Sequence, residues 1–355
     1  MTLRRALLSA AILAPMLASC ATAPGDGFDD QGAAIRAYAD LTDTGFTGDF
    51  AVSQPGQPDT IYYGATDPDE ASVRTLEGWP WASVTKQVIA VLVMREVEEG
   101  RLALDSDVGA LIPALRGRGL TVEDLLRHRS NLPNPDETPR DDSGFPSFYT
   151  SKSDPLDFCT EGQDDTEQEA GWQYNNCDYI VLGAVLEASA NSSLDLLLAQ
   201  GIGLDAGWYN TSFMEADSER PFASRDQTAA DRIAGYGASG ALVGPLDDML
   251  LFDRALMDGV LLSDDALAQL WNGNPTTGSM ALGQWVFEAP LAGCNNPVRI
   301  VERRGAIGDY QLRNVMMPDL GIAVALATDQ PEFDFAEIWT GNGPMHDLLA
   351  TLACG

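Results

Sequence analysis

Trp81-Ala82-Ser83-Val84-Thr85-Lys86 leads directly into the apolar stretch Gln87-Val88-Ile89-Ala90-Val91-Leu92-Val93-Met94. The apolar spacing predicts a helix over residues 83–99, and its nearly all-apolar middle predicts that this helix is central and buried. Ser83 and Lys86 are three positions apart, which places their side chains on one face of the first turn. A serine at a helix N-terminus with an amine beside it has the arrangement of an activated nucleophile and its base. The alternative is a helix-capping serine followed by a surface lysine.

The size and charge of the chain limit what it can be. Its 355 residues, 45% of them hydrophobic, suffice for one large globular domain, and no break in composition demands a second one. The formal net charge of −32 opposes binding to nucleic-acid phosphates and electrostatic docking on anionic lipid. We therefore expect a folded, strongly acidic protein with no nucleic-acid partner.

The N-terminus has the pattern of an export signal. Arg4-Arg5 precedes an apolar run over residues 6–18, which is too short to span a bilayer. The run ends in Leu17-Ala18-Ser19-Cys20, which resembles the lipobox of bacterial lipoproteins, with Cys20 as the residue that would carry the lipid. The alternative is cleavage after Ala21-Thr22-Ala23 without a lipid.

The lipoprotein pattern predicts where the mature protein is found. We expect residues 1–20 to be a signal peptide, and the protein to be exported and lipid-anchored to the outer membrane on its periplasmic side. The residue after the cysteine is Ala21 and not aspartate. By the same resemblance to lipoproteins, this fits sorting to the outer membrane. Residues 21–40 are small and polar, which predicts a tether between the lipid and a folded body over residues 41–355.

The remaining cysteines agree with export. Cys159, Cys177, Cys294 and Cys354 form an even number, as expected in an oxidising compartment. Three pairings are open, of which we favour Cys159–Cys177 and Cys294–Cys354; the alternative is four reduced, buried thiols. No cysteine is spaced with histidines as a zinc site requires, so we expect no metal.

Strand and helix patterns occur in blocks along the chain. The expected strands cover residues 46–52, 60–64, 298–303, 310–317 and 321–327. The expected helices cover residues 83–99, 121–128, 178–190, 194–199, 244–257 and 346–353. Residues 134–170 have no sustained periodicity, which predicts a long functional or mobile loop. If strands from both ends of the chain pair in one antiparallel sheet flanked by helices, the fold class is α+β.

Tyr174-Asn175-Asn176 is a second candidate for chemistry. Tyr174 could take or give a proton if a nearby ammonium stabilises its phenolate. Asn176 could position an amide group of a substrate. The alternative is an aromatic anchor with Asn176 as the cap of the following helix.

The two motifs Ser83-Val84-Thr85-Lys86 and Tyr174-Asn175-Asn176 together resemble the penicillin-recognising serine hydrolases. Among these, the chain is most similar to class C β-lactamase-like proteins and their esterase and D-aminopeptidase relatives. The stretches over residues 121–130 and 237–248 also resemble that group, and the likeness runs from about residue 45 to about residue 330. The resemblance implies a β-lactamase/DD-peptidase-like fold with a mainly helical subdomain.

The resemblance also implies roles for individual residues. Ser83 matches the acylated nucleophile, and Lys86 matches its partner in proton transfer. Tyr174 matches the general base, and Asn176 matches the ligand of the substrate amide. No metal or organic cofactor is implied.

The third motif of the family departs from the usual pattern. Where relatives have Lys-Thr-Gly or His-x-Gly, this chain has Arg303-Arg304-Gly305, followed by Ala306. The resemblance implies that Gly305 lets the substrate approach the backbone, and that the N–H groups of Ala306 and Ser83 form an oxyanion hole. Arg303 keeps a positive charge near the site, which would favour a neutral Lys86, but arginine cannot shuttle a proton.

These observations predict a serine hydrolase that acts on an ester or amide bond through an acyl-enzyme. The expected substrates are small esters, amides or D-amino-acid peptides. The alternative function is a catalytically impaired binding module of the cell envelope that kept the fold. A Ser-His-Asp hydrolase is disfavoured, because only His128 and His346 are available and no Gly-x-Ser-x-Gly motif is present.

Overall fold

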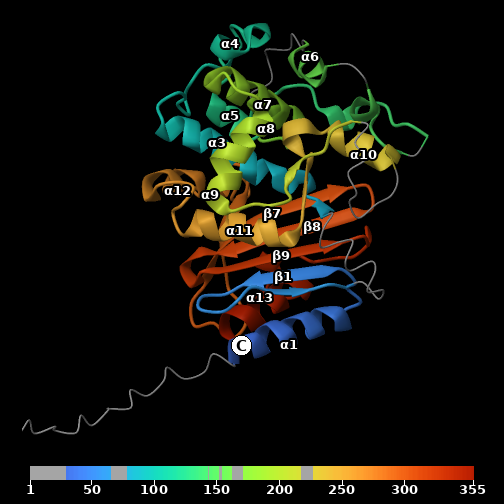
Figure 1. Ribbon diagram of the computed structural model, residues 1–355, viewed down its shortest axis with the longest axis vertical. Helices are drawn as coiled ribbons and strands as arrows, with labels where there is room; N and C mark the ends of the chain where they lie inside the picture. Colours follow the sequence, from blue (N-terminus) through green and yellow to red (C-terminus); the bar gives the residue numbers. More distant parts are fainter. Residues whose placement is uncertain (1–28, 65–77, 143, 152–153, 162–170, 217–226) are drawn as a thin grey trace, which may run out of the picture.

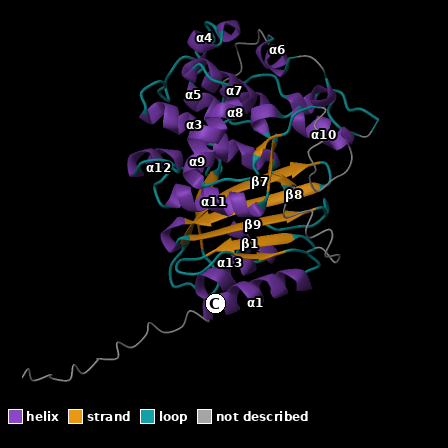
Figure 2. Cartoon of the chain, viewed as in Figure 1, coloured by secondary structure: helices purple, strands orange, loops and turns teal. Residues whose placement is uncertain are grey.

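The computed structural model describes residues 29–64, 78–142, 144–151, 154–161, 171–216 and 227–355. Its centre is a six-stranded antiparallel sheet with two terminal helices on one side and a larger helical block on the other (Figure 1, Figure 2). The strands, in order across the sheet, are β2 (Thr60–Tyr62), β1 (Asp49–Ser53), β9 (Ile322–Thr328), β8 (Tyr310–Met317), β7 (Val298–Ile307) and β6 (Trp285–Ala289).

The sheet joins the two ends of the chain. β1 is inserted between β2 and β9, so that Ala51 lies opposite Ile61 on one side and Ala325 on the other. β7, β8 and β9 follow one another as an antiparallel meander. The prediction of an α+β fold, with a sheet built from N-terminal and C-terminal strands, is therefore confirmed.

The two faces of β9 carry side chains of different size. Val324 and Leu326 point into a core shared with the terminal helices, whereas the alternating alanines Ala323, Ala325 and Ala327 belong to the core on the other face. Successive residues of a strand point to opposite faces. The small alanines allow α11 (Leu246–Met257) to pack directly on β9 and β1.

The prediction of a tether over residues 21–40 is wrong from Asp29 onward. Residues Asp29–Asp43 form α1, which packs on the C-terminal helix α13 (Pro344–Cys354). Ala34 and Ala37 are completely buried in this contact layer. A segment rich in alanine has linker-like composition, but alanine is also the strongest helix former and permits close helix packing. Residues 21–28 lie outside the described part of the chain.

The helical block is built around α3 (Thr85–Glu98). Residues 88–94 of this helix are buried, as the all-apolar run predicts. The other helices of the block are α4 (Val108–Leu111), α5 (Val122–Leu126), α6 (Pro155–Thr160), α7 (Asn176–Ala190), α8 (Leu194–Leu198), α9 (Leu204–Ala206), α10 (Gln227–Ala234) and α12 (Asp264–Leu270). A second sheet, in the order β3-β5-β4, consists of β3 (Trp79–Pro80), β5 (Leu242–Gly244) and β4 (Ser212–Phe213). These strands have only two or three residues, which is too short for a detectable alternation.

Short elements occupy the described part of the segment 134–170, which was expected to be one long loop. Two 3-10 turns, Pro135–Glu137 and Ser147–Thr150, precede α6. The side chain of Asn134 accepts a hydrogen bond from the N–H of Asp136 and starts the first turn. Elements of three to six residues leave no periodic signal, so the sequence pattern could not reveal them.

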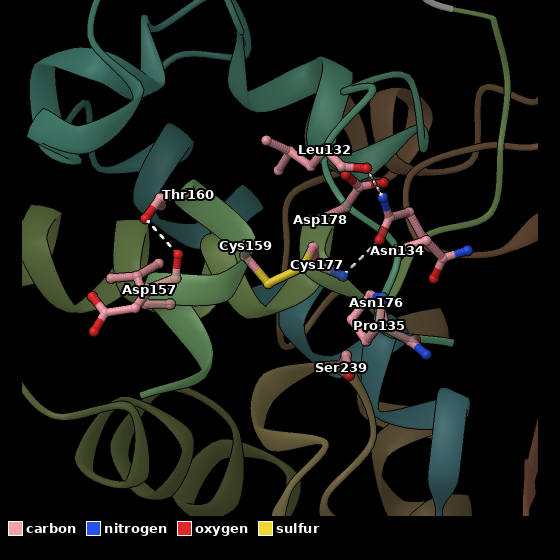
Figure 3. Close-up of a disulfide and its surroundings, with 12 residues drawn as sticks. Leu132, Asn134, Pro135, Asp157, Cys159, Thr160, Asn176, Cys177, Asp178 and Ser239 are labelled. Atoms are coloured by element: carbon pink, nitrogen blue, oxygen red, sulfur yellow. Dashed lines mark hydrogen bonds between the residues drawn. A yellow bond between two sulfur atoms is a disulfide. The ribbon is translucent and has the colours of Figure 1, made fainter. Parts of the chain in front are cut away.

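Both favoured disulfides are present. Cys159–Cys177 ties α6 to the first turn of α7 (Figure 3), and Cys294–Cys354 ties the end of α13 to the connection before β7. Closing loops of 18 and 60 residues removes conformational entropy from the unfolded chain, which corresponds to ~3 and ~4 kcal/mol. The first bridge also anchors the segment that leads into α7.

Among the described residues, no single helix is long and apolar enough to cross a membrane. By length and composition alone, α7 and the helical stretch Leu194–Ala206 taken together are long and apolar enough for a membrane span, but they are bent by 81° relative to each other.

Candidate active site

The candidate nucleophile lies immediately before the central helix. Ser83 is the middle residue of the 3-10 turn Ala82–Val84 (η1), and α3 begins at Thr85. Ala82 has a φ of 46°, a left-handed conformation that is uncommon for a residue other than glycine. Ser83 is half-buried, while Ala82 and Val84 on either side are fully buried. The turn therefore presents the Ser83 hydroxyl while its neighbours are fixed in the core.

Lys86 is completely buried beside Ser83. Its Nζ lies 3.1 Å from Ser83 Oγ, 2.7 Å from Asn176 Oδ1 and 2.6 Å from the carbonyl oxygen of Ser239. Burial lowers the pKa of Lys86 from 10.5 to about 8; the Tyr174 oxygen raises it in part, and the charge of Arg303 lowers it again. An amine with this pKa can give and take protons near neutral pH.

Tyr174 completes a triangle with these two side chains. Its hydroxyl oxygen lies 2.5 Å from Ser83 Oγ and accepts a hydrogen bond from Arg303 Nη2 at 3.0 Å. Burial alone would raise the pKa of Tyr174, but the positive charges of Lys86 and Arg303 bring it below the ordinary value. Tyr174 can therefore act as a base toward the Ser83 hydroxyl.

The start of α7 fixes the position of Tyr174. The side chain of Asn175 caps the helix by accepting a hydrogen bond from the N–H of Cys177 at 2.8 Å. Asn176 is thus the first helical residue, not the cap, and its side chain is free to face Lys86. Figure 3 shows this helix start beside the disulfide and next to Ser239.

Arg303 lies on β7 and is fully buried. Its Nε donates to the carbonyl oxygen of Ser83 at 2.9 Å, and its guanidinium lies over the rings of Trp285 and Tyr174, 4.9 and 5.3 Å from their centroids. Nη1 has no hydrogen-bond partner among the described residues. Arg303 therefore links the nucleophile turn to the tyrosine and retains one free donor.

The glycine of the third motif lies directly against the nucleophile turn. A Cβ atom added to Gly305 would lie 2.5 Å from the carbonyl oxygen of Trp81 and 3.3 Å from the backbone nitrogen of Ser83. Any larger residue would push β7 away from η1. Ala306, the next residue, is exposed. The backbone segment expected to supply the oxyanion hole thus lies beside Ser83.

Three side chains that the sequence did not single out extend the site beyond Asn176. Asn176 Nδ2 lies 3.2 Å from Asp136 Oδ2 and 2.8 Å from the hydroxyl of Tyr149, which itself donates to Asp136 Oδ1 at 2.6 Å. The ring of Tyr149 stacks on that of Tyr236, with centroids 3.7 Å apart. All three residues come from short turns or from the loop after α10, where the sequence offered no motif.

A buried polar cluster supports Tyr174 from behind. The ring of His128 lies 4.7 Å from that of Tyr174, and its Nδ1 lies 2.9 Å from Asp178 Oδ2. Burial lowers the pKa of His128 well below its ordinary value and raises the pKa of Asp178 well above its own. Ser130 donates to Asp178 rather than to the histidine, so these residues do not form a Ser-His-Asp triad. The raised pKa of Asp178 weakens the tendency of this carboxyl to place a buried negative charge behind Tyr174.

The structure brings five of the expected site residues together. Ser83, Lys86, Tyr174, Asn176 and Arg303 form one connected hydrogen-bond network. Cys20, which was expected to carry a lipid, lies outside the described residues. In the part of the chain that is described, no cluster of histidine, cysteine and acidic side chains could hold a metal ion.

Comparisons with known proteins show what this chain is similar to. Residues 33–341 match the family model described as Beta-lactamase. The penicillin-binding protein PbpX of Bacillus subtilis (strain 168) is 23% identical over 228 residues, which are 61% of this chain and 55% of PbpX. Esterase EstB of Burkholderia gladioli is 30% identical over 192 residues, which are 44% of this chain and 47% of EstB. The chain spans about half the length of these curated relatives.

Solved structures share the fold over nearly the whole chain. D-amino acid amidase from Ochrobactrum anthropi SV3, complexed with L-phenylalanine amide, has a TM-score of 0.67 at 20% identity over 91% of this chain and 98% of the amidase. A D-stereospecific amidohydrolase from Streptomyces sp. has a TM-score of 0.69 at 20% identity, over 91% of this chain and 98% of its own. The expected β-lactamase-like fold is therefore confirmed.

Proposed function

The chain belongs to the beta-lactamase family, and we propose that it is a serine hydrolase that cleaves an ester or amide bond through an acyl-enzyme on Ser83. The observation that carries the proposal is the contact between three reactive groups. Ser83 Oγ lies 2.5 Å from the Tyr174 oxygen and 3.1 Å from Lys86 Nζ. A hydroxyl placed between two bases of lowered pKa is an activated nucleophile.

The proposed reaction has two acyl-transfer steps. Ser83 Oγ forms a bond to the substrate carbonyl carbon while its proton passes to Tyr174 or Lys86. The same proton then reaches the departing alcohol or amine, and the bond to the leaving group breaks. A water molecule attacks the acyl-enzyme in the second step, gives its proton to the same pair of bases, and releases the acid and Ser83.

The developing negative charge needs donors on the side opposite the bases. We assign this role to the backbone N–H groups of Ser83 and Ala306, because β7 runs so close to the nucleophile turn that a Cβ atom added to Gly305 would lie 3.3 Å from the Ser83 nitrogen. Two donors held in place in this way contribute a few kcal/mol each in acyl transfer. Arg303 contributes by its positive charge beside Tyr174 and by its hydrogen bonds to the Tyr174 hydroxyl and the Ser83 carbonyl oxygen.

Small esters, amides and D-amino-acid peptides are the proposed substrates. An esterase and two amide hydrolases are among the similar proteins, and the reaction needs no cofactor. Arg303 replaces the lysine or histidine that β-lactam-hydrolysing relatives carry in the third motif, so antibiotic hydrolysis is not the activity that we propose.

Labelling with a fluorophosphonate probe tests this proposal. We expect one adduct per chain, located on Ser83 by peptide mass spectrometry and lost in Ser83→Ala. Ser239→Ala is the matched control, because this neighbouring serine contacts Lys86 only through its backbone carbonyl oxygen. The Ser239→Ala protein should still be labelled on Ser83. Adducts elsewhere would contradict the assignment of the nucleophile. No adduct together with no turnover of esters and D-amino peptides would favour the binding-module alternative.

We also propose that the protein is exported and held at the outer membrane by a lipid on Cys20, as the N-terminal sequence pattern indicates. Metabolic labelling with a radioactive fatty acid in a bacterial host should mark the wild-type protein and not Cys20→Ser. The Cys20→Ser protein should leave the membrane fraction. Secretion of an unlabelled wild-type protein cleaved after Ala23 would contradict the lipid anchor and leave export intact.

A further inference from the structure

We propose that the Cys159–Cys177 disulfide positions the active site, so that the enzyme reaches full activity only after this bridge has formed. The inference rests on the proposed function and deepens it, because it names a covalent bond that controls the same site. The other disulfide, Cys294–Cys354, ties the end of α13 on the far side of the central sheet (Figure 1) and is the natural comparison.

The bridge begins next to a residue of the hydrogen-bond network. Cys177 follows Asn176 directly in the first turn of α7, and both cysteines of the bridge are completely buried (Figure 3). Asn176 Oδ1 accepts a hydrogen bond from Lys86 Nζ at 2.7 Å, and this Nζ lies 3.1 Å from Ser83 Oγ. The disulfide is therefore one residue away from a direct partner of a proposed base.

A row of aromatic rings leads back from the bridge to the same residue. Phe158, which precedes Cys159, packs on Phe148 with ring centroids 4.8 Å apart, and Phe148 packs edge-on against Tyr149 at 5.1 Å. The Tyr149 hydroxyl accepts a hydrogen bond from Asn176 Nδ2 at 2.8 Å. The row thus ends on the amide of the residue beside Cys177.

Asn176 is held from two directions, and both meet at the disulfide. Its backbone is joined to Cys177, and its amide is oriented by Tyr149 through the aromatic row that Cys159 anchors. The orientation matters because the oxygen of an amide accepts and its nitrogen donates. With Nδ2 directed to Tyr149, Oδ1 faces Lys86 Nζ, so the bridge keeps the acceptor on the side of the base.

The helix α6 depends on the bridge more than α7 does. It has six residues, too few for a stable helix on their own, and Cys159 is its one completely buried residue. In contrast, α7 packs on α3 and α5, and the Asn175 side chain caps it and also donates to the carbonyl oxygen of Leu132 at 2.7 Å. Opening the bridge therefore releases α6 and the aromatic row, while α7 stays in place.

Formation of the bridge is an oxidation that the compartment controls. The thiols of Cys159 and Cys177 lose two protons and two electrons when the S–S bond forms, and a disulfide oxidant takes up both and becomes two thiols. The cytoplasm keeps thiols reduced, whereas an oxidising compartment favours the bridge. With the export proposed above, full activity arises after the protein has left the cytoplasm.

Two double variants of the full chain test the inference: Cys159→Ser with Cys177→Ser, and Cys294→Ser with Cys354→Ser. The bridges close 18 and 60 residues, so the second variant should lose more thermal stability. We expect the reverse order for activity, measured on an ester well below both unfolding transitions. In the first variant kcat should fall roughly 10- to 100-fold, as for a displaced site group, and in the second by less than about twofold. Activity losses in the order of the stability losses would overturn the inference.

The pH profile of the first variant distinguishes positioning from a loss of folded enzyme. Burial lowers the pKa of Lys86, whereas Tyr174 and Asp136 raise it, and the hydrogen bond to Asn176 also favours the charged amine. Asp136 is itself held by the Tyr149 hydroxyl at 2.6 Å. Displacing these partners should move the acidic limb of kcat/KM to lower pH. An unchanged midpoint with lower activity at every pH is the result of partial unfolding, and it would count against the inference.

Tyr149→Phe tests the route from the bridge to the site. This change removes the hydroxyl, keeps the ring, and should lower kcat while the disulfide is intact. Combined with Cys159→Ser and Cys177→Ser, it should lower kcat by less than about a further twofold, because both changes act on one contact. Losses that multiply in the combined variant would show that the bridge does not act through Tyr149.

Reduction of the folded protein tests the bridge without changing Cys159 or Cys177. In the variant that lacks Cys294 and Cys354, dithiothreitol should lower kcat as far as removal of the first bridge does, and glutathione disulfide should restore it. Full activity while thiol titration shows both thiols free would overturn the inference and leave the hydrolase proposal intact. No ester hydrolysis by the oxidised wild type, together with no adduct on Ser83, would instead contradict the proposed function.

Discussion

Replacing Lys86 by methionine is expected to lower kcat by roughly 1,000-fold, within the range for loss of a positioned proton-transfer group. Lys86 is fully buried and offers its three protons to Ser83 Oγ, Asn176 Oδ1 and the Ser239 carbonyl, so no other amine can replace it. Methionine fills a similar volume without a charge, but it leaves Asn176 Oδ1 and the Ser239 carbonyl oxygen without this donor, which costs about 1–3 kcal/mol of stability for each acceptor left unpaired. Steady-state kinetics on an ester, with thermal unfolding as the folding control, measure this effect.

The pH profile gives a sharper test of the same site. The bases must be deprotonated to activate Ser83, so wild-type kcat/KM should rise with pH and be lost as pH falls through about 8, the pKa of Lys86. Because two groups interact, this value belongs to the Lys86–Tyr174 pair. In Lys86→Met, Tyr174 loses the cation that lowers its pKa, so the limb of the residual activity should move to higher pH. In Tyr174→Phe, Lys86 loses a partner that raises its pKa, so the limb should move to lower pH.

Shifts in opposite directions are specific to this arrangement. A merely structural role for either residue would lower activity at every pH and leave the midpoint unchanged. A midpoint that moves in the same direction in both variants would contradict the view that each group sets the pKa of the other.

The sequence was informative where a residue's role is local. The apolar run after Ser83 predicted a buried central helix. A helix was also expected from residue 121, and in the structure the Thr121 hydroxyl caps α5 by accepting from the N–H of Asp124. Such features depend on residues three or four positions apart. The short motifs around Ser83, Tyr174 and Arg303 then located most of the hydrogen-bond network.

The parts that were missed depend on contacts between distant segments. Asp136 stands in an acidic stretch without periodicity, and only folding brings its carboxylate to Asn176, 40 positions later. His128 and Asp178 are 50 positions apart in the sequence. Either residue alone gives no signal, and only the fold brings them together as a buried, hydrogen-bonded pair behind the ring of Tyr174. The misassigned tether has a similar cause, since α1 is a helix that gains its partner, α13, from the other end of the chain.

The second large effect is expected at Arg303, where the chain departs from its family. Arg303→Met should lower kcat/KM at pH 7 by roughly 100-fold, the loss typical of removing a preorganised donor. Its positive charge lowers the pKa of Lys86 and of Tyr174, so the limb of the profile should move to higher pH and activity should partly recover in alkaline buffer.

Arg303→Lys separates charge from geometry. Lysine keeps a positive charge near Tyr174, so the midpoint should stay closer to that of the wild type than in Arg303→Met. Lysine has one donor group instead of a planar fork, so it cannot contact both the Ser83 carbonyl and the Tyr174 hydroxyl as Nε and Nη2 do. We therefore expect Arg303→Lys to lower kcat with little change in the midpoint of the pH profile. Arg303→Met should change both kcat and the midpoint. If the midpoint in Arg303→Met equals that of the wild type, the guanidinium acts as a structural link between β7 and η1 and does not tune the bases.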